Sequence, residues 1–456
     1  MKTLVSINPA TGLVLDAFPV MSPEGIENII NQSHDIFLQW RKFTLADRIE
    51  KIKKLSDLLN QNHHKYVRVI SLEMGKLYKE SQAEVKKCAQ LCDYYAHHAQ
   101  AFLADELVKT EYTKSYISYQ PLGVILGIMP WNFPFWQVLR YAVPTLLVGN
   151  TVLLKHASNV PQCGKLLENI FHEAGIEGFH NLVISSAQIE PVIKHAKVKA
   201  VTLTGSNGAG KQVAQLAGAY IKKTVLELGG SDPYIILKDA DIGLAVDKCV
   251  QSRLLNVGQS CISAKRFIID KNIYDEFVSA FKQKLMGYVP GDPFDESTNL
   301  GPLATENIRT QLHAQVINSL QKGAECILGG DIYEQDGFYY QPTILTEIKP
   351  GMPAYEEELF GPVASMIKVN DEQEAISVAN DHGYGLGSAI FSRDLEKAEK
   401  LAKTELQAGS CFVNDFVKSD PRLPFGGINQ SGYGRELSRH GIVEFTNIKT
   451  ICIQKP

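Results

Sequence analysis

Short apolar runs alternate with amphipathic runs between residues 121 and 229, and this alternation constrains the fold more than any other feature. The apolar runs are typical of buried strands and the amphipathic runs of helices. The expected strands are 123–129, 151–154, 180–184, 200–203 and 223–227, and the expected helices are 137–147, 161–174, 189–195 and 208–218. Alternating strands and helices predict a parallel, doubly wound sheet, which binds ligands at the carboxyl ends of its strands.

A second region with the same alternation runs from about residue 230 to 420. Its expected strands include 266–270, 364–369 and 387–391, and its expected helices include 242–255, 274–286 and 307–322. Two such regions in 456 residues agree with the size at which chains divide into domains. Residues 22–103 precede both regions, and their helical periodicity predicts three helices packed against a sheet.

The overall composition excludes several classes of protein. A formal net charge of −4 gives no reason to expect nucleic acid or an anionic membrane as partner. No apolar run reaches the roughly 18 residues of a membrane span, and Met1–Val5 lacks the apolar core of a signal peptide, so we expect a cytoplasmic protein. Eight cysteines form no disulfide framework. Cys88 and Cys92, near His97 and His98, are expected to pack in a core, and we expect no metal site.

One cysteine lies in a setting that suits chemistry. Cys261 is in the polar stretch 256–266, between an expected helix and an expected strand, and Gly258 lets the backbone there approach a ligand closely. A buried, inert cysteine is the commoner case. Three polar residues in distinctive local sequences favour a nucleophile instead, and they are Asn132, Glu227 and Glu358.

Seven short motifs in a fixed order relate the chain to a known family. They are Pro130–Pro134, Lys155, Thr204–Ser206, Glu227–Gly230, Gly258–Cys261, Glu358–Pro362 and Pro424–Gly427. The sequence resembles the aldehyde dehydrogenase superfamily over essentially its whole length, and among its members the short bacterial succinate-semialdehyde dehydrogenases. The resemblance implies an α/β protein with two doubly wound domains, one a Rossmann-like cofactor domain and the other a catalytic thiol domain, plus a small β oligomerisation arm.

The resemblance also implies domain boundaries. Residues 1–103 and 122–229 would form the NAD(P)-binding domain, and residues 230–430 the catalytic domain. Residues 104–121 and 440–456 would form oligomerisation strands, since 111–120 alternates polar and apolar side chains and 449–454 is expected to pair with it. An ordinary edge hairpin is the alternative. Unpaired strand edges predict a homodimer or homotetramer.

Family resemblance and chemistry agree on three catalytic roles. A Cys261 thiolate that adds to an aldehyde gives a thiohemiacetal, and its oxidation by a nicotinamide leaves a thioester. The Asn132 side chain and the Cys261 backbone N–H are expected to stabilise the oxyanion. Glu227 is expected to activate the water that hydrolyses the thioester. The presence of Glu227 argues against transfer of the acyl group to coenzyme A.

The resemblance further implies a dinucleotide site. Gly205 and Ser206 follow an expected strand and open a helix, where free N–H groups bind phosphate. Lys155 is similar to the family lysine at the adenosine ribose. The other residues expected to contact the cofactor are Trp131, Glu358 and Phe360.

Ser158 favours NADP over NAD as the cofactor. Many NAD-specific relatives have a glutamate at this position, three residues after the ribose lysine, where it repels a 2′-phosphate. A neutral hydroxyl removes that repulsion, and Lys155 supplies positive charge. NADP is therefore expected first and NAD second.

Arg140 predicts the class of aldehyde. It lies eight residues after Asn132 on an expected helix, so the two side chains can share a face. A guanidinium in a tunnel lined by Trp136 and Phe425 is suited to a distal carboxylate. An arginine at this position is a further resemblance to succinate-semialdehyde dehydrogenases. An ion pair with a nearby acid is the competing interpretation.

Several positions depart from the family pattern. A second family arginine, six residues before the nucleophile, is Leu255 here, and Arg422 is the hypothetical replacement. Family lysines or asparagines are replaced by Asn429 and Ser231, and Arg439 stands at the position we assign to a second acid. These departures leave Cys261, Asn132 and Glu227 in place.

Together these features predict oxidation of an ω-carboxy aldehyde, first succinate semialdehyde, to its carboxylate. The alternatives are a broader aldehyde dehydrogenase, a thiol esterase that uses no nicotinamide, and a catalytically silent structural relative. An esterase would not need Lys155 or Glu358, and a silent relative has no reason to keep the three catalytic residues together.

Overall fold

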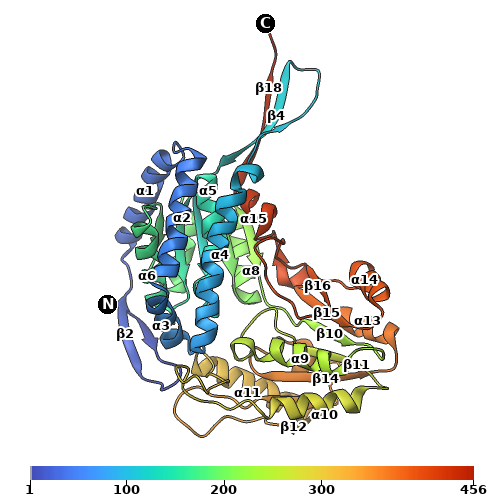
Figure 1. Cartoon of the computed structure of the whole chain (residues 1–456). Helices are drawn as coiled ribbons and strands as arrows, with labels where there is room; N and C mark the ends of the chain where they lie inside the picture. The colour runs from blue at the N-terminus through green and yellow to red at the C-terminus, as the bar shows by residue number, and fades with distance from the viewer. Residues whose placement is uncertain (1–2) are drawn as a thin grey trace.

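Two sheets dominate the computed structural model, which describes residues 3–456 (Figure 1). One sheet has the strand order β17-β9-β8-β5-β6-β7, and the other has the order β12-β13-β14-β11-β10-β15-β16. In each sheet all neighbouring strands are parallel except one pair, which is β17–β9 in the first sheet and β12–β13 in the second. The predicted class of two doubly wound α/β units is confirmed.

The strands follow the predicted pattern closely. The first sheet contains β5 (Val124–Met129), β6 (Thr151–His156), β7 (Phe179–Asn181), β8 (Val198–Thr204), β9 (Lys223–Glu227) and β17 (Gly432–Tyr433). The second contains β10 (Pro233–Ile236), β11 (Arg266–Asp270), β12 (Glu325–Leu328), β13 (Thr343–Thr346), β14 (Val363–Val369), β15 (Gly387–Phe391) and β16 (Ser410–Val413). A hairpin of β1 (Thr3–Ile7) and β2 (Val14–Pro19) lies before the first helix.

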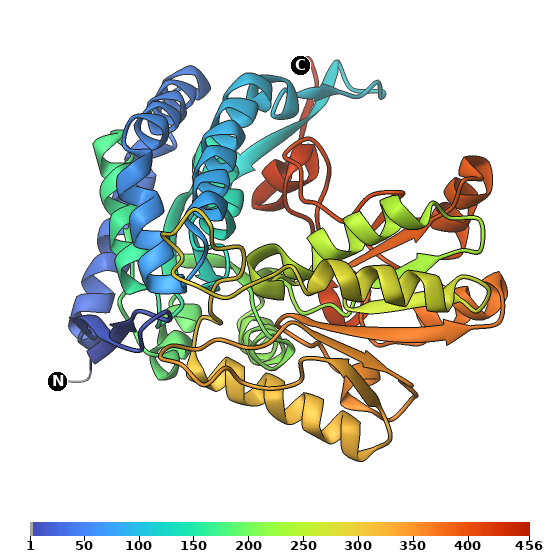
Figure 2. The same cartoon turned by 60° about the horizontal axis from the view of Figure 1, so that its bottom comes forward.

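Helices cover both sheets. Those of the first part are α1 (Pro23–Trp40), α2 (Leu45–Gln61), α3 (His63–Met74), α4 (Tyr78–Phe102), α5 (Trp136–Val148), α6 (Pro161–Glu173), α7 (Ile189–Lys194) and α8 (Asn207–Ala219). Those of the second part are α9 (Ile242–Leu254), α10 (Tyr274–Leu285), α11 (Glu306–Gln321), α12 (Pro353–Glu356), α13 (Glu372–Asn380) and α14 (Leu395–Thr404), and α15 (Ser438–Glu444) follows. The blue N-terminal helices lie on one side of the molecule and the yellow to orange segments of the second sheet on the other (Figure 2).

The N-terminal region has four helices in place of the three predicted. Thr44 caps α2 through a reciprocal bond with Asp47, which is the expected sequence signal for a helix start. Asn62 then leaves helical geometry and α3 begins without a side-chain cap, so the junction carries no strong signal in the sequence. Helix α3 ends at Gly75, which has a left-handed φ of 75°.

Helix α5 lies in the interior of the first domain, and all thirteen of its residues are buried. It packs against α4 and α2 on one side and against β5 and β6 on the other. Continuous burial explains its nearly continuous apolar sequence. It also makes the one arginine within it, Arg140, expensive to bury without partners.

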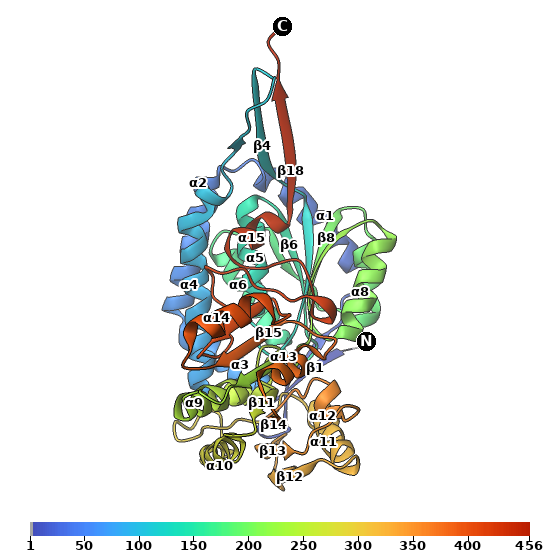
Figure 3. The same ribbon diagram turned by 90° about the vertical axis from the view of Figure 1, so that its right-hand side faces the viewer.

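Three strands form an arm that projects from the body of the molecule (Figures 1 and 3). They are β3 (Glu106–Leu107), β4 (Lys114–Pro121) and β18 (Thr446–Ile453). Strands β4 and β18 pair antiparallel along their whole length, from Thr446 opposite Pro121 to Ile453 opposite Lys114. The predicted pairing of the C-terminal strand is confirmed, although β4 begins three residues later than predicted. No helix in residues 3–456 is long and apolar enough to cross a membrane.

Candidate active site

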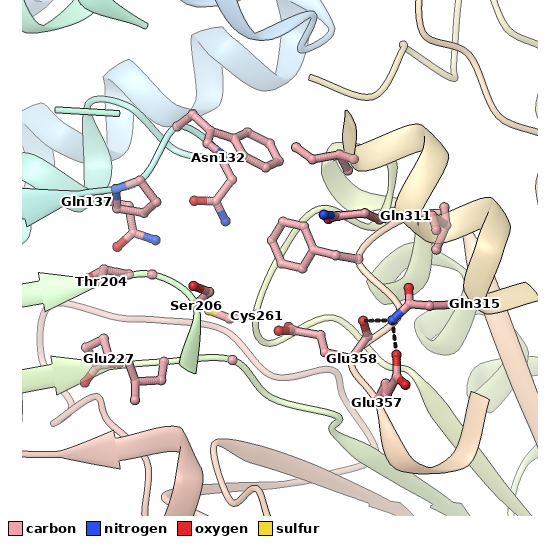
Figure 4. A pocket seen from close by; sticks show the side chains of 18 residues that line it. Asn132, Gln137, Thr204, Ser206, Glu227, Cys261, Gln311, Gln315, Glu357 and Glu358 are labelled. Carbon is pink, nitrogen blue, oxygen red and sulfur yellow. Dashed lines mark hydrogen bonds between the residues drawn. The ribbon is translucent and has the colours of Figure 1, made fainter. Parts of the chain in front are cut away.

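A cavity of about 560 Å³ lies at the carboxyl ends of β5, β8 and β9, where the first sheet faces the second domain (Figure 4). Parallel sheets bind ligands at this edge. Eight of the predicted site residues line the cavity, namely Trp131, Asn132, Gly205, Ser206, Glu227, Cys261, Glu358 and Phe360. The structure therefore brings the predicted nucleophile, carboxamide and carboxylates to one place.

The loop before the nucleophile has an unusual backbone. A short 3₁₀ helix, η2 (Leu255–Gly258), follows α9, and within it Asn256 and Val257 have φ of 54° and 56°. This left-handed region is costly for a β-branched residue, so tertiary contacts must hold the loop. A side chain at Gly258, where φ is 75°, would meet Arg253 Nη2 at 2.6 Å. Strain of this kind is concentrated at functional sites.

Hydrogen bonds tie this loop to the turn that carries Asn132. Asn132 Nδ2 donates to the Gln259 carbonyl at 3.1 Å, and Asn256 Nδ2 donates to the Asn132 carbonyl at 2.9 Å. Each carboxamide nitrogen has two N–H groups. One N–H of Asn132 therefore fixes the side chain, and the other is available to a reacting oxygen in the cavity.

Two opposing effects act on the pKa of the Cys261 thiol. Burial raises the pKa of its thiol to about 12, while the nearby Lys265 ammonium acts to lower it. The fully buried Lys265 Nζ donates to the carbonyls of Ser260 at 2.9 Å and Cys261 at 2.7 Å, and it pairs with Glu358 Oε1 at 3.0 Å. Lys265 therefore fixes the backbone at Cys261 relative to the Glu358 carboxylate.

Glu227 lies at the end of β9 with both carboxylate oxygens buried and free of hydrogen bonds within the described chain. Burial raises its pKa, whereas the nearby Arg140 guanidinium opposes that rise. Arg140 itself pairs with Glu436, an acid that β17 brings beside Glu227, since Gly432 is aligned with Glu227. A carboxylate that activates water must be able to lose its proton near neutral pH. A nearby guanidinium favours that loss, and burial opposes it.

The second acid of the site was assigned to the wrong position in the sequence. The buried carboxylate near the base belongs to Glu436. Arg439, three residues later, is half-exposed and bonds Glu106 and Tyr119 at the base of the arm. The error arose because Glu436 precedes α15 whereas Arg439 lies within it, and only the folded chain shows which of the two side chains points inward.

Helix α4 holds both the turn that carries Asn132 and the loop that precedes Cys261. Glu84 Oε1 accepts hydrogen bonds from the backbone N–H groups of Phe135 at 2.9 Å and Trp136 at 3.0 Å, at the start of α5. One turn earlier, Glu80 Oε1 accepts from the Asn256 N–H at 3.0 Å. Glu84 also pairs with the buried Lys76. The turn of the carboxamide and the loop of the nucleophile are therefore fixed by one rigid element.

The residues expected to bind a dinucleotide have the right chemistry for it. Ser206 caps the N-terminus of α8, where free N–H groups favour phosphate. Lys155, at the end of β6, is buried and forms no ion pair within residues 3–456, and burial lowers its pKa. A buried cation without a partner suits a phosphorylated ribose. Ser158, three residues further on, is exposed and carries no charge.

The predicted substrate residues divide into two groups. Arg140, Trp136 and Phe425 are buried together, and the Arg140 guanidinium lies 4.7 Å from the centroid of the Phe425 ring. Arg422 is exposed and binds both oxygens of Asp420, at 2.9 and 2.7 Å, so it lies outside this group. The competing interpretation predicted that Arg140 pairs with a nearby acid. Arg140 does form such an ion pair, with Glu436.

Other residues at the site were missed from the sequence. Lys265 is four residues after the nucleophile and was treated as part of the turn. Gln311 and Gln315 on α11 line the cavity, and Gln315 Nε2 donates to Glu357 Oε2 at 2.8 Å and to the Glu358 carbonyl at 3.3 Å (Figure 4). Helix periodicity places glutamines on a polar face, and no local signal distinguishes a face that lines a cavity from one in water.

The fold and the site define a class of protein, a dehydrogenase that uses a nicotinamide dinucleotide and a cysteine nucleophile. The aldehyde dehydrogenase family model matches residues 1–451. A probable NADP(+) succinate-semialdehyde dehydrogenase of Synechocystis sp. is 45% identical over 452 residues, covering 99% of both chains. An NAD(P)+ succinate semialdehyde dehydrogenase of Escherichia coli is 44% identical, covering 98% of this chain and 97% of that one.

A solved structure is also similar to this chain over nearly its whole length. The succinic semialdehyde dehydrogenase of Streptococcus pyogenes in complex with NADP+ is similar with a TM-score of 0.97 and 40% identity, covering 99% of this chain and 100% of that chain. The chain belongs to the aldehyde dehydrogenase family.

Proposed function

We propose that the protein oxidises succinate semialdehyde to succinate with NADP+ as the preferred cofactor. The observation that carries the proposal is the convergence of Cys261, Asn132 and Glu227 in one cavity at the carboxyl edge of the first sheet. The names of the similar Synechocystis and Streptococcus pyogenes proteins support the substrate and the cofactor. A broader aldehyde dehydrogenase is the second candidate, because Arg140 is already paired with Glu436.

In the proposed mechanism Cys261 attacks the aldehyde carbon. The free N–H of the Asn132 carboxamide stabilises the oxyanion of the resulting thiohemiacetal, a contribution typically worth about 2.7–4 kcal/mol per donor. When bound, the nicotinamide supplies the two-electron acceptor of the reaction. Oxidation of the adduct leaves an acyl thioester on Cys261, and Asn132 holds the same oxygen in the second tetrahedral intermediate.

Glu227 completes the cycle by taking a proton from the water that hydrolyses the thioester. Its two oxygens have no other hydrogen-bond partner within the described residues, so both are free for water. The Arg140–Glu436 pair beside it tunes the proton affinity of the base, since the guanidinium favours the ionised form of Glu227.

The experiment that tests the proposal compares a panel of aldehydes with both cofactors by absorbance at 340 nm. Wild-type enzyme should prefer succinate semialdehyde and NADP+. Cys261→Ala should abolish reduction of the cofactor, and Glu227→Gln should give one burst of reduced cofactor without turnover. An active Cys261→Ala protein would end the thiol mechanism, and a wild-type preference for uncharged aldehydes would end the substrate assignment.

Ser158 offers a separate test of the cofactor preference. Ser158→Glu places a carboxylate three residues after Lys155, where it would repel a 2′-phosphate and accept a bond from a 2′-hydroxyl. The ratio of kcat/KM for NADP+ to that for NAD+ should fall by at least about tenfold, because one repelled charge is worth more than about 1.4 kcal/mol. Wild-type enzyme that strongly prefers NAD+ would contradict the assignment.

We also propose a homodimer or homotetramer in the cytoplasm. Strand β18 is an edge strand of the arm, with its outer backbone groups unpaired within residues 3–456, and edges of this kind pair with other chains. All eight cysteines are free thiols, which is typical of a reducing compartment.

A further inference from the structure

Three side chains that can bind a metal ion lie together where α6 packs against β7, the last strand of the first sheet. They are Glu168 and His172 on α6 and His180 on β7, and one ligand atom of each lies within 4.8 Å of the others. Glu168 and His172 occupy positions i and i+4 of the helix, so they share a face. None of the three lines the cavity that holds Cys261, so the cluster is separate from the site described above.

The His180 ring lacks a hydrogen-bond partner within residues 3–456. Its Nε2 is buried without a partner, and its Nδ1 lies 3.9 Å from Glu168 Oε1, which is too long for a hydrogen bond. The residue is only 5% exposed, and a buried imidazole ordinarily forms at least one hydrogen bond. Burial lowers the pKa of His180 to about 4, so the ring is neutral at pH 7 and forms no ion pair with the carboxylate. A bound cation would satisfy the lone pair of this ring and the adjacent carboxylate together.

Backbone hydrogen bonds hold the other two side chains in place. Glu168 Oε1 accepts from the Asn181 N–H at 2.9 Å, and His172 Nε2 donates to the Phe179 carbonyl at 2.8 Å. Because a carbonyl only accepts, the neutral His172 ring has its proton on Nε2 and its lone pair on Nδ1. Metal-binding histidines ordinarily donate their second nitrogen to a carbonyl or carboxylate in this way. Both backbone partners lie in β7 on either side of His180, so the strand that supplies one ligand also orients the other two.

The ligand set and its spacing suit a transition metal. Two imidazole nitrogens and one carboxylate oxygen match Zn²⁺, whereas Mg²⁺ and Ca²⁺ prefer oxygen ligands. In a tetrahedral Zn²⁺ site the ligand atoms are about 3.3–3.5 Å apart, because each lies about 2.0–2.2 Å from the ion. Small rotations of the exposed His172 and the half-buried Glu168 would bring the three side chains to this spacing around the buried His180. Because His172 is exposed, water can take the fourth position.

We propose that Glu168, His172 and His180 bind one Zn²⁺ ion, which joins α6 to β7 at the edge of the first sheet. From the sequence we expected no metal site, and the ligands come instead from a helix and a strand that only folding brings together. Strand β7 has three residues and pairs on one side only, with β6. A metal link therefore stabilises an element that few backbone hydrogen bonds hold. The inference does not depend on the proposed reaction.

Zn²⁺ uptake and thermal stability of the full chain, after dialysis against a chelator, test the site. Equilibrium dialysis should show one fewer equivalent of Zn²⁺ in Glu168→Gln and in His172→Ala than in the wild type. Cysteine thiols also bind Zn²⁺, but they are the same in all three proteins. Zn²⁺ at about 100 times its Kd should raise the Tm of the wild type by about 2–3 °C, and both variants should lack this rise. Mg²⁺ at the same concentration should leave the Tm unchanged, because the site has only one oxygen ligand.

Two matched controls remove a similar side chain outside the cluster. His97→Ala on α4 and Glu173→Gln at the end of α6 replace exposed residues and should bind as much Zn²⁺ as the wild type. The decisive variant is His172→Ala, because its exposed side chain contributes little to the fold, whereas replacement of the buried His180 disturbs packing. Zn²⁺ uptake and a Tm rise in His172→Ala equal to those of the wild type would overturn the proposal. An equal loss of uptake in His97→Ala would also overturn it, because Zn²⁺ would then bind to scattered surface histidines.

Discussion

Burial and charge act in opposite directions on the Cys261 thiol. Burial raises its pKa to about 12, and the Lys265 ammonium acts against that rise without cancelling it. In the free enzyme the thiol is therefore protonated at neutral pH. Formation of the thiolate then requires a bound ligand or a base that lowers the pKa or takes the proton.

Alkylation of the free enzyme tests this state of the thiol. Because only the thiolate reacts, modification of Cys261 by iodoacetamide should rise about tenfold per pH unit between pH 7 and pH 10. Peptide mass spectrometry would measure it, with a small free thiol in the same solution as the reference. Lys265→Met removes the opposing charge and should slow modification of Cys261 across this range. Modification of Cys261 at pH 7 as fast as that of the free thiol would contradict the assignment.

The positions of single residues in the cavity were predictable where the local sequence is distinctive. Cys261, Asn132 and Glu227 each lie in a short motif at the end of an expected strand or helix, so the sequence showed both the side chain and its place. Glu436 carries no such signal, because the pairing of β17 with β9 returns it to Glu227 only in the folded chain.

At the scale of elements, α4 determines the geometry of the site. Its carboxylates Glu80 and Glu84 bind backbone N–H groups of the nucleophile loop and of the first turn of α5. Burial raises the pKa of Glu80, and its hydrogen bond to the Asn256 N–H opposes that rise. Carboxylates that accept backbone hydrogen bonds hold loops more tightly than neutral acceptors do. The strained left-handed backbone at Asn256 persists because this helix supports it.

Neutralising Glu84 should loosen this support. Glu84→Gln leaves the ammonium of Lys76 buried without its partner, and breaking a buried pair costs about 3–5 kcal/mol. The Tm should fall clearly and kcat should fall with it, because the oxyanion turn is attached to α5. Asp93→Asn, at an exposed position on the same helix, is the control. The double variant Lys76→Met/Glu84→Gln should recover part of the Tm, and a Glu84→Gln protein as stable as the wild type would refute the role.

Elements with strong local signals were predicted almost to the residue. Strand β11 and helix α9 match within one residue, because apolar runs there are bounded by clear turn residues. Helix α3 was missed, since its start at Asn62 has no capping hydrogen bond and its polar positions interrupt the periodicity. Local propensity set the bounds of elements whose ends carry clear sequence signals. Tertiary packing set the bounds of the other elements.

At the scale of the whole molecule, the segment after β16 runs back from the second sheet to the first and lies beside the site. After β16 the chain passes Ser419 and Phe425 and then pairs β17 with β9, so the C-terminal segment belongs to both halves. This route brings the loop at Ser419 against α4. The geometry around Glu227 therefore depends on how this segment joins the two sheets.

The projecting arm predicts how the protein assembles. Its strands extend beyond the body, and apolar side chains on them are exposed, with Leu107 at 77% and Ile448 at 61%. Strand β18 is an edge with one side unpaired in the single described chain, and an exposed apolar edge is unfavourable in water. A second copy that covers this edge by a symmetric contact removes the cost.

Light scattering should give a mass that is two or four times the 50.5 kDa of one chain. Ile448→Asp places a charge on the edge and should shift the mass toward a single chain, since a buried unpaired carboxylate opposes association. Leu395→Asp, at a 61% exposed position on α14, is the matched control and should leave the mass unchanged. A wild-type mass near 50.5 kDa, or an Ile448→Asp protein that assembles like the wild type, would show that the arm protects its edge without a partner.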